Sequence, residues 1–158
     1  GLGGGSADAS FTLKALNKLF ELKLTNIELE KYALQLGADC PFFIDNKPKF
    51  VEGIGEKMTS VDLDFSEYEI RLINPKIHIS TKEAYTDVVP RIPQKSISDV
   101  IELPINEWKD KLRNDFEDSV FLKYPKLKSI KEILYNEGSL YGSMTGSGSF
   151  FYSINLIS

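Results

Sequence analysis

The sequence has little of the chemistry from which metal and disulfide sites are built. Its 158 residues include one cysteine, Cys40, and one histidine, His78. A single cysteine excludes an intrachain disulfide and a zinc site made of several cysteines. His78 has no acidic or cysteine neighbour at ligand spacing, so we expect it to be structural, and we expect Cys40 to be a small buried residue. The lone cysteine fits a reducing, cytoplasmic setting.

Long apolar runs and an excess of positive charge are also missing. No stretch approaches the roughly 20 apolar residues of a membrane-spanning helix, and no charged-then-apolar leader is present. The formal net charge is −4 at pH 7 and the sequence pI is about 5.1. Because nucleic-acid binding relies on basic surfaces, we expect neither nucleic acid nor a membrane as the main partner.

The composition is that of a folded protein. Hydrophobic residues make up 42% of the chain and charged residues 27%, which is close to the average of globular domains. The length fits one ordinary domain or parts of two smaller lobes.

Patterns in the first 64 residues predict two helices and a hairpin. A helix capped by Ser6 or Asp8 is expected to run to Leu22. A capping box at 25–28 opens a second helix that ends at Gly37. We expect five apolar residues of this helix to face inward: Ile27, Leu29, Tyr32, Ala33 and Leu36. A turn and an apolar strand-like run follow at 37–44, and then two short strands between residues 49 and 61.

The rest of the chain is expected to alternate between strands and helices without regular βαβ order. A strand is predicted over 68–73, a short helix opened by a second capping box at 80–83, an irregular proline-rich stretch over 90–104, helices over 105–116 and 124–136, and strands over 139–143 and 150–157. This order indicates an α+β fold.

The most informative feature is the glycine run at the start of the chain. Four of the 11 glycines lie within Gly1–Gly5, directly before a helical pattern. Backbone N–H groups in such a stretch can surround an anion at the positive end of the helix. The run is not a P-loop, because no Gly-Lys-Ser/Thr follows, and Ser6 stands where the dinucleotide fingerprint needs its third glycine. A flexible glycine tail is the alternative.

A second glycine-rich segment lies at 142–149 and reads Gly-Ser-Met-Thr-Gly-Ser-Gly-Ser. Its backbone could approach a phosphate or a substrate without side-chain hindrance. An ordinary β-turn between two strands is an equally good interpretation.

Together, the two loops resemble the second and third glycine motifs of the GHMP small-molecule kinases. The segments 37–43 (Gly-Ala-Asp-Cys-Pro-Phe-Phe), 50–56 (Phe-Val-Glu-Gly-Ile-Gly-Glu) and 114–117 (Asn-Asp-Phe-Glu) are similar to the members of that family whose substrate carries a cytidine diphosphate group. Two glycine loops more than a hundred residues apart are more specific than either alone. The resemblance extends over nearly the whole chain.

The resemblance implies a two-lobed α+β kinase. Residues 1–64 would form part of the ATP-binding lobe, and residues 65–158 a ferredoxin-like, substrate-side lobe. The implied activity is ATP-dependent phosphorylation of a hydroxyl of a small molecule in the non-mevalonate synthesis of isoprenoid precursors, with ATP and Mg²⁺ as cofactors.

The resemblance also implies roles for particular residues. Asp39 would be the catalytic base that takes the proton of the substrate hydroxyl, and Thr81 and Tyr85 would bind the substrate, with Tyr85 against its cytosine. ATP binding falls to the opening loop: Gly1, Leu2, Gly3, Gly4, Gly5, Ser6 and Ala7. From the residues alone, Asp39 could instead bond its own backbone, Ser6 could be an N-cap, and Tyr85 could be a core residue.

The chain departs from the family pattern at two points. Ala7 stands where a second serine is usual, and the segment carrying the lysine that pairs with the catalytic aspartate is not in this sequence. We therefore expect the chain by itself to lack significant kinase activity. Two other functions stay open: another GHMP kinase, such as a homoserine kinase, and a non-catalytic anion-binding module. Asn114, Asp115 and Glu117 could join the surface between the lobes, with a solvated helix end as the alternative.

Overall fold

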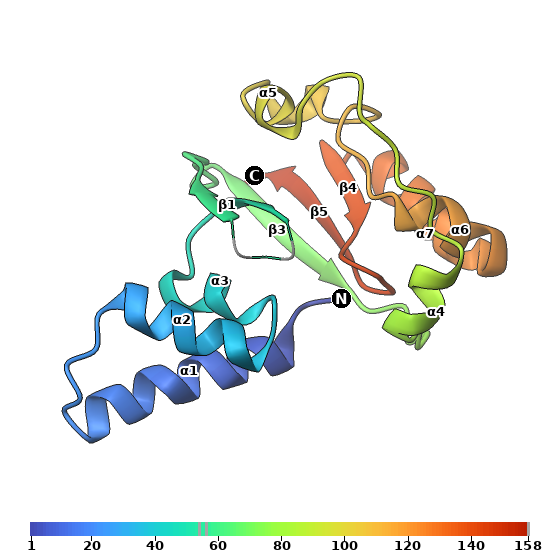
Figure 1. The fold of residues 1–158 in the computed structure, drawn as a ribbon. Helices are drawn as coiled ribbons and strands as arrows, with labels where there is room; N and C mark the ends of the chain where they lie inside the picture. The colour runs from blue at the N-terminus through green and yellow to red at the C-terminus, as the bar shows by residue number, and fades with distance from the viewer. Residues whose placement is uncertain (54, 56, 158) are drawn as a thin grey trace. The chain divides into compact units, whose positions relative to one another are not determined.

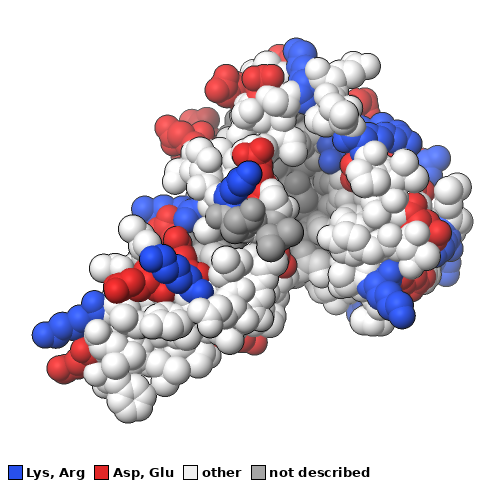
Figure 2. All heavy atoms as spheres, viewed as in Figure 1, with Lys and Arg blue, Asp and Glu red and all other residues white. Residues whose placement is uncertain are grey.

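The chain is divided into two compact units. The computed structural model describes residues 1–53, 55 and 57–157 (Figure 1). One unit is Gly3–Leu63, and the other joins Gly1–Leu2 to Asp64–Ser158. The assignment of residues 1–64 to an ATP-binding lobe and 65–158 to a substrate-side lobe stays a prediction. Figure 2 shows acidic and basic side chains intermixed on the face that it presents, in line with the small net charge.

The first unit contains three helices and a two-stranded hairpin. The elements are α1 (Gly4–Leu19), α2 (Asn26–Leu36), α3 (Cys40–Asp45), β1 (Lys49–Glu52) and β2 (Lys57–Ser60). The predicted capping box is confirmed: Thr25 accepts from the Glu28 N–H while the Glu28 carboxylate accepts from the Thr25 N–H. The antiparallel hairpin between 49 and 61 is confirmed too.

Three predictions for this unit are wrong. The first helix begins at Gly4 behind a left-handed Gly3, so neither Ser6 nor Asp8 is its cap. The run 40–45 is a helix rather than a strand, because Pro41 suits the first turn and Asn46 ends it with a left-handed backbone.

The third error concerns the inner face of α2. Only Leu29 and Ala33 are buried, in a small core with Cys40 and Ile44 that includes the expected buried cysteine. Ile27, Tyr32 and Leu36 are exposed.

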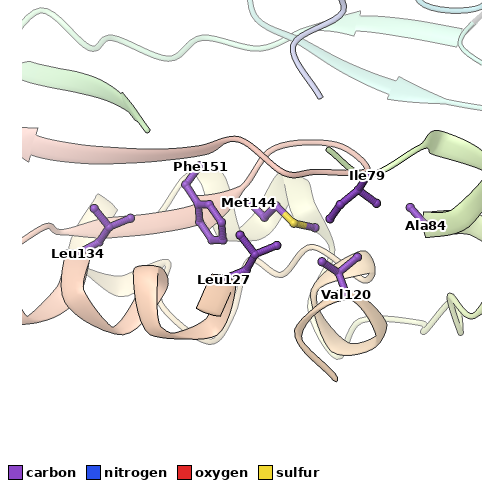
Figure 3. Packing of buried hydrophobic residues seen from close by; sticks show 7 residues of the cluster. All are labelled: Ile79, Ala84, Val120, Leu127, Leu134, Met144 and Phe151. Atoms are coloured by element: carbon purple, nitrogen blue, oxygen red, sulfur yellow. The ribbon is translucent and has the colours of Figure 1, made fainter. Parts of the chain in front are cut away.

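The second unit contains an antiparallel sheet with strand order β3-β5-β4. Its elements are β3 (Tyr68–Ile73), α4 (Thr81–Thr86), α5 (Ile97–Ile101), a 3₁₀ turn η1 (Ile105–Glu107), α6 (Phe116–Lys123), α7 (Pro125–Asn136), β4 (Tyr141–Met144) and β5 (Phe151–Leu156). Met144 and Phe151 from the sheet meet side chains of α4, α6 and α7 in one core (Figure 3). The seven residues of that core are Ile79, Ala84, Val120, Leu127, Leu134, Met144 and Phe151.

The segment between Pro90 and Phe116 differs from the prediction. Helix α5 lies inside the stretch expected to be irregular, because Ser96 caps it by accepting from the Asp99 N–H at 3.0 Å. The helix predicted over 105–116 is only a 3₁₀ turn followed by loop, and α6 begins at Phe116. The strand over 68–73, the helix after Ser80 and the two last strands are confirmed. Ser80 accepts from the Glu83 N–H as predicted, but the Glu83 carboxylate accepts from the Tyr124 hydroxyl, so the reciprocal half of the capping box at 80–83 is not formed.

Candidate active site

The opening glycine loop presents free backbone donors at the start of a long helix. Gly3 has φ +64°, and α1 then runs for 16 residues. Its first helical bond joins the Ala7 N–H to the Gly3 carbonyl at 2.9 Å, so the amides of Gly4, Gly5 and Ser6 lie in the turn where helical partners are missing. A Cβ on Gly4 or Gly5 would have nothing within 4 Å among the described atoms. The helix dipole adds positive potential at this end.

The first residue of this loop is held by the second glycine loop. The Thr145 hydroxyl donates to the Gly1 carbonyl at 2.7 Å. A Cβ on Gly1 would lie 2.5 Å from the Thr145 carbonyl oxygen and 3.0 Å from that of Gly148. Only glycine fits such a close approach. The structure therefore brings Gly1 of the first motif against Thr145 of the second, 144 residues away in the sequence.

The second glycine loop is the turn between β4 and β5. Its Thr145 N–H bonds to the Phe150 carbonyl, and Gly146 and Gly148 have φ values of +53° and +90°. The interpretation as a turn between strands is thus confirmed. A direct contact of this loop with phosphate or substrate stays a prediction.

Asp39 lies at the start of α3, and its side chain is exposed. It occupies the N-cap position without a side-chain cap bond, so the alternative of an aspartate that caps its own helix is wrong. The backbone next to Asp39 is held by a hydrogen bond from α1. The hydroxyl of Ser10, which is fully buried on α1, donates to the Cys40 carbonyl at 2.6 Å. The glycine-loop helix and the Asp39 turn are therefore tied together inside one unit.

A second support for the Asp39 turn comes from the hairpin between β1 and β2. Gly55 has φ +111°, and a Cβ there would lie 2.4 Å from the Ala38 carbonyl oxygen. This is a physical reason for glycine in the segment 50–56. Ile54 and Glu56 of the same segment lie outside the described residues.

We expect Gly55→Ala to destabilise the protein by about 1–3 kcal/mol, because it adds backbone strain and a clash with Ala38. Gly138→Ala is the matched control, since Gly138 also has a positive φ (+94°) but open space for a Cβ. Urea titration measures the two losses, and amide chemical shifts of 38–40 report the turn. Equal losses of stability in the two variants, with unchanged amide shifts at 38–40, would contradict the idea that Gly55 supports the Asp39 turn.

Thr81 and Tyr85 lie on one face of α4, as predicted. Tyr85 is 62% exposed, so the alternative of a core residue is wrong. Its ring meets Phe116 edge-on, with the centroids 4.9 Å apart. The two residues belong to the second unit, whereas Asp39 and Gly3–Ala7 belong to the first. Their contact with a cytosine stays a prediction.

Tyrosines beside the second glycine loop remain protonated at neutral pH. Burial raises the pKa of Tyr141, whose hydroxyl donates to the Leu112 carbonyl at 2.9 Å. Burial also raises the pKa of Tyr152. Neither phenol is therefore suited to accept a substrate proton.

Sequence reasoning missed Ser10, and it misjudged Asn114 and Glu117. Glu117 is only 7% exposed, and it binds the Met144 N–H, so the segment 114–117 is not a solvated helix end. The signal for Ser10 was a small polar residue on the inner face of a helix. Asn114 and Glu117 could have been noticed through the Asn-Asp-Phe-Glu motif, but the motif does not predict which residues they contact. His78 is exposed.

The sequence and the structure were compared with known proteins. The family model described as GHMP kinases N terminal domain matches residues 1–47, and the one described as GHMP kinases C terminal matches residues 96–154. Among the described residues, no helix is long and apolar enough to cross a membrane.

Two curated relatives of the chain carry the same name. A 4-diphosphocytidyl-2-C-methyl-D-erythritol kinase of Azobacteroides pseudotrichonymphae genomovar. CFP2 is 52% identical over 98% of this chain and 58% of its own length. The protein of that name from Bacteroides fragilis (strain YCH46) is 48% identical over 98% of this chain and 56% of its own length.

A solved structure agrees with these relatives. It is a crystal structure of 4-(cytidine 5'-diphospho)-2C-methyl-D-erythritol kinase, with a TM-score of 0.79 and 27% identity, covering 96% of this chain and 56% of that one. The chain thus spans between half and two thirds of the proteins that it matches. The predicted α+β fold and the resemblance to the GHMP kinases are confirmed.

Proposed function

Because the chain belongs to the GHMP kinase family, we propose that the full-length protein containing it phosphorylates the 2-hydroxyl of 4-diphosphocytidyl-2-C-methyl-D-erythritol with ATP. The observation that carries this proposal is the 52% identity, over 98% of the chain, to a kinase named for that substrate. The product would serve isoprenoid precursor synthesis. The lone, buried Cys40 is consistent with a cytoplasmic enzyme.

The geometry of the glycine loop favours the proposal that this loop binds the ATP phosphates. The free amides of Gly4, Gly5 and Ser6 and the dipole of α1 offer donors and positive potential where the triphosphate needs them. Mg²⁺, bound with ATP, would neutralise charge on the phosphates, and the Ser6 hydroxyl is the oxygen of this loop suited to help hold it. The first turn of α1 has no acidic side chain to repel a phosphate.

Asp39 supports the transfer step. Its exposed carboxylate, free of a cap bond to α3, would accept the proton of the 2-hydroxyl as that oxygen attacks the γ-phosphorus. The new O–P bond forms while the bond between the γ-phosphorus and the β,γ-bridging oxygen breaks, and ADP leaves. The Ser10 and Gly55 contacts would keep the Asp39 turn rigid during this step.

Tyr85 and Thr81 support recognition of the cytidine end. An exposed tyrosine ring steadied at its edge by Phe116 offers a face on which a pyrimidine can stack. Thr81, one turn earlier and also exposed, offers a hydroxyl on the same side of α4.

The proposal is tested by incubating the purified full-length protein with Mg-ATP and 4-diphosphocytidyl-2-C-methyl-D-erythritol. We expect ADP release and a product heavier by one phosphoryl group. CDP should also protect the protein in a thermal shift. Turnover of homoserine without cytidine-dependent protection would favour the other kinase, and failure to turn over either alcohol would favour the non-catalytic module. The 158-residue chain, run in parallel, tests the expectation that it is inactive alone.

A further inference from the structure

The turn between β4 and β5 is held by Asn114, just before α6, and by Glu117 in the first turn of α6. Asn114 and Glu117 both contact the backbone of Met144, Asn114 at its carbonyl and Glu117 at its N–H. All three residues belong to the unit Gly1–Leu2 plus Asp64–Ser158. These contacts join segments about 30 residues apart, so local sequence does not dictate them.

Asn114 uses its whole amide. Its Oδ1 accepts from the Phe116 N–H at 3.0 Å, which fixes which end of the amide carries the protons. The Nδ2 group then donates to the Met144 and Gly146 carbonyls, both at 2.8 Å. An Nδ2 has two protons and here meets two acceptors. Aspartate, which has the same shape, would set a carboxylate oxygen against both carbonyls.

Glu117 anchors the other side of the turn. Its Oε1 accepts from the Met144 N–H at 2.9 Å and lies 3.2 Å from the Ser143 hydroxyl, while its Oε2 pairs with the Lys131 ammonium at 2.5 Å. These contacts offset the cost of burying a carboxylate that is only 7% exposed. Glu117 therefore links α7 to the strand that enters the turn.

The turn held in this way meets the start of the phosphate-binding segment. Thr145 donates to the Gly1 carbonyl, and a Cβ on Gly146 would lie 3.3 Å from that same oxygen. An open cavity of about 450 Å³ borders this turn. Its lining includes Asn114, Met144, Thr145 and Gly146. A shift of the turn would move both Gly1 and this cavity wall.

We propose that Asn114 and Glu117 are positioning residues for phosphoryl transfer. They fix the β4–β5 turn and, through Thr145, the backbone of Gly1, which belongs to the same unit. The inference rests on the proposed kinase function, since a displaced turn changes the rate only where it borders a reacting phosphate. Small displacements of such groups cost up to about 10²-fold in rate.

The test uses the full-length protein with Asn114→Ala, Asn114→Asp and Glu117→Gln. Matched controls are Asn136→Ala and Glu132→Gln, at exposed positions on α7. We expect both Asn114 variants to lower kcat/KM for ATP about tenfold or more, and Glu117→Gln to cause a smaller loss, because its amide oxygen still accepts from Met144. In all three, the ¹⁵N–¹H shifts of Gly146 and Gly148 should move, and a thermal midpoint above the assay temperature verifies that each variant is folded when its rate is measured.

The outcomes separate the two proposals. If the unmodified protein does not phosphorylate the alcohol, the proposed function fails. If it does so and Asn114→Ala keeps the kcat/KM of Asn136→Ala, the positioning role is overturned, whatever the glycine shifts show. If both Asn114 variants fail to fold, Glu117→Gln provides the test. A lower kcat/KM and faster hydrogen exchange of the Met144 amide would support the positioning role. Wild-type values for both would overturn it.

Discussion

Asp39→Asn is expected to lower kcat of the full-length protein by about 10²–10⁴-fold, the usual contribution of a general base. An asparagine side chain keeps the shape of aspartate but cannot take up the proton of the substrate hydroxyl. The fold should survive, because the Asp39 side chain is exposed and does not cap α3. KM for ATP should change little, since the expected phosphate donors lie in another loop.

The control for this change is Asp62→Asn. Asp62 is exposed in the same unit, between β2 and β3, and its replacement removes the same charge. Steady-state kinetics and a thermal midpoint for both variants separate lost chemistry from lost folding. Equal kcat values for the two variants would remove Asp39 from the mechanism and favour the non-catalytic interpretation.

Phe151→Ala is expected to destabilise the second unit by about 3–5 kcal/mol, as large aromatic-to-alanine changes in cores do. Phe151 is fully buried and stacks on Phe121 with ring centroids 6.1 Å apart. It lies on the central strand, opposite Ile73 on one side and Met144 on the other. The cavity would therefore open where the sheet meets the helices (Figure 3).

Leu122→Ala is the matched control, because Leu122 lies on α6 but is 84% exposed. Urea titration followed by circular dichroism and by fluorescence of Trp108, which is buried in the same unit, gives the free energy of unfolding. We expect a change within about 0.5 kcal/mol for the control. A loss of similar size in both variants would mean that the cluster around Phe151 does not hold this unit together.

Features that depend on neighbouring residues could be predicted from the sequence. The capping box at Thr25 and Glu28, the Ser80 cap and the hairpin between 49 and 61 all formed. Short apolar stretches could not be assigned in this way. Residues 40–45 fit a strand or a helix equally well by pattern, and only the Pro41 start, the Asn46 end and burial against α1 and α2 selected the helix.

The residues of the candidate site also fall into two groups, those that the sequence could identify and those that it could not. The glycine-rich segments and Asp39 could be found because their residue types are unusual and match a family pattern. Ser10, Asn114 and Glu117 could not be assigned their roles, because each acts through a partner about 30 residues away. An isolated serine, asparagine or glutamate is compatible with many surface positions, and its role depends on what the fold places beside it.

The sequence by itself determined which backbone segments can approach an anion, since glycine content and helix starts are local properties. The order of the predicted elements also indicated the class of fold, and the negative net charge argued against nucleic acid as a partner. Only the tertiary structure decided how the turn after Met144 is held, how Gly1 meets it and how Ser10 supports the Asp39 turn. Those contacts depend on distances between remote segments, which packing of the cores fixes and no local pattern encodes.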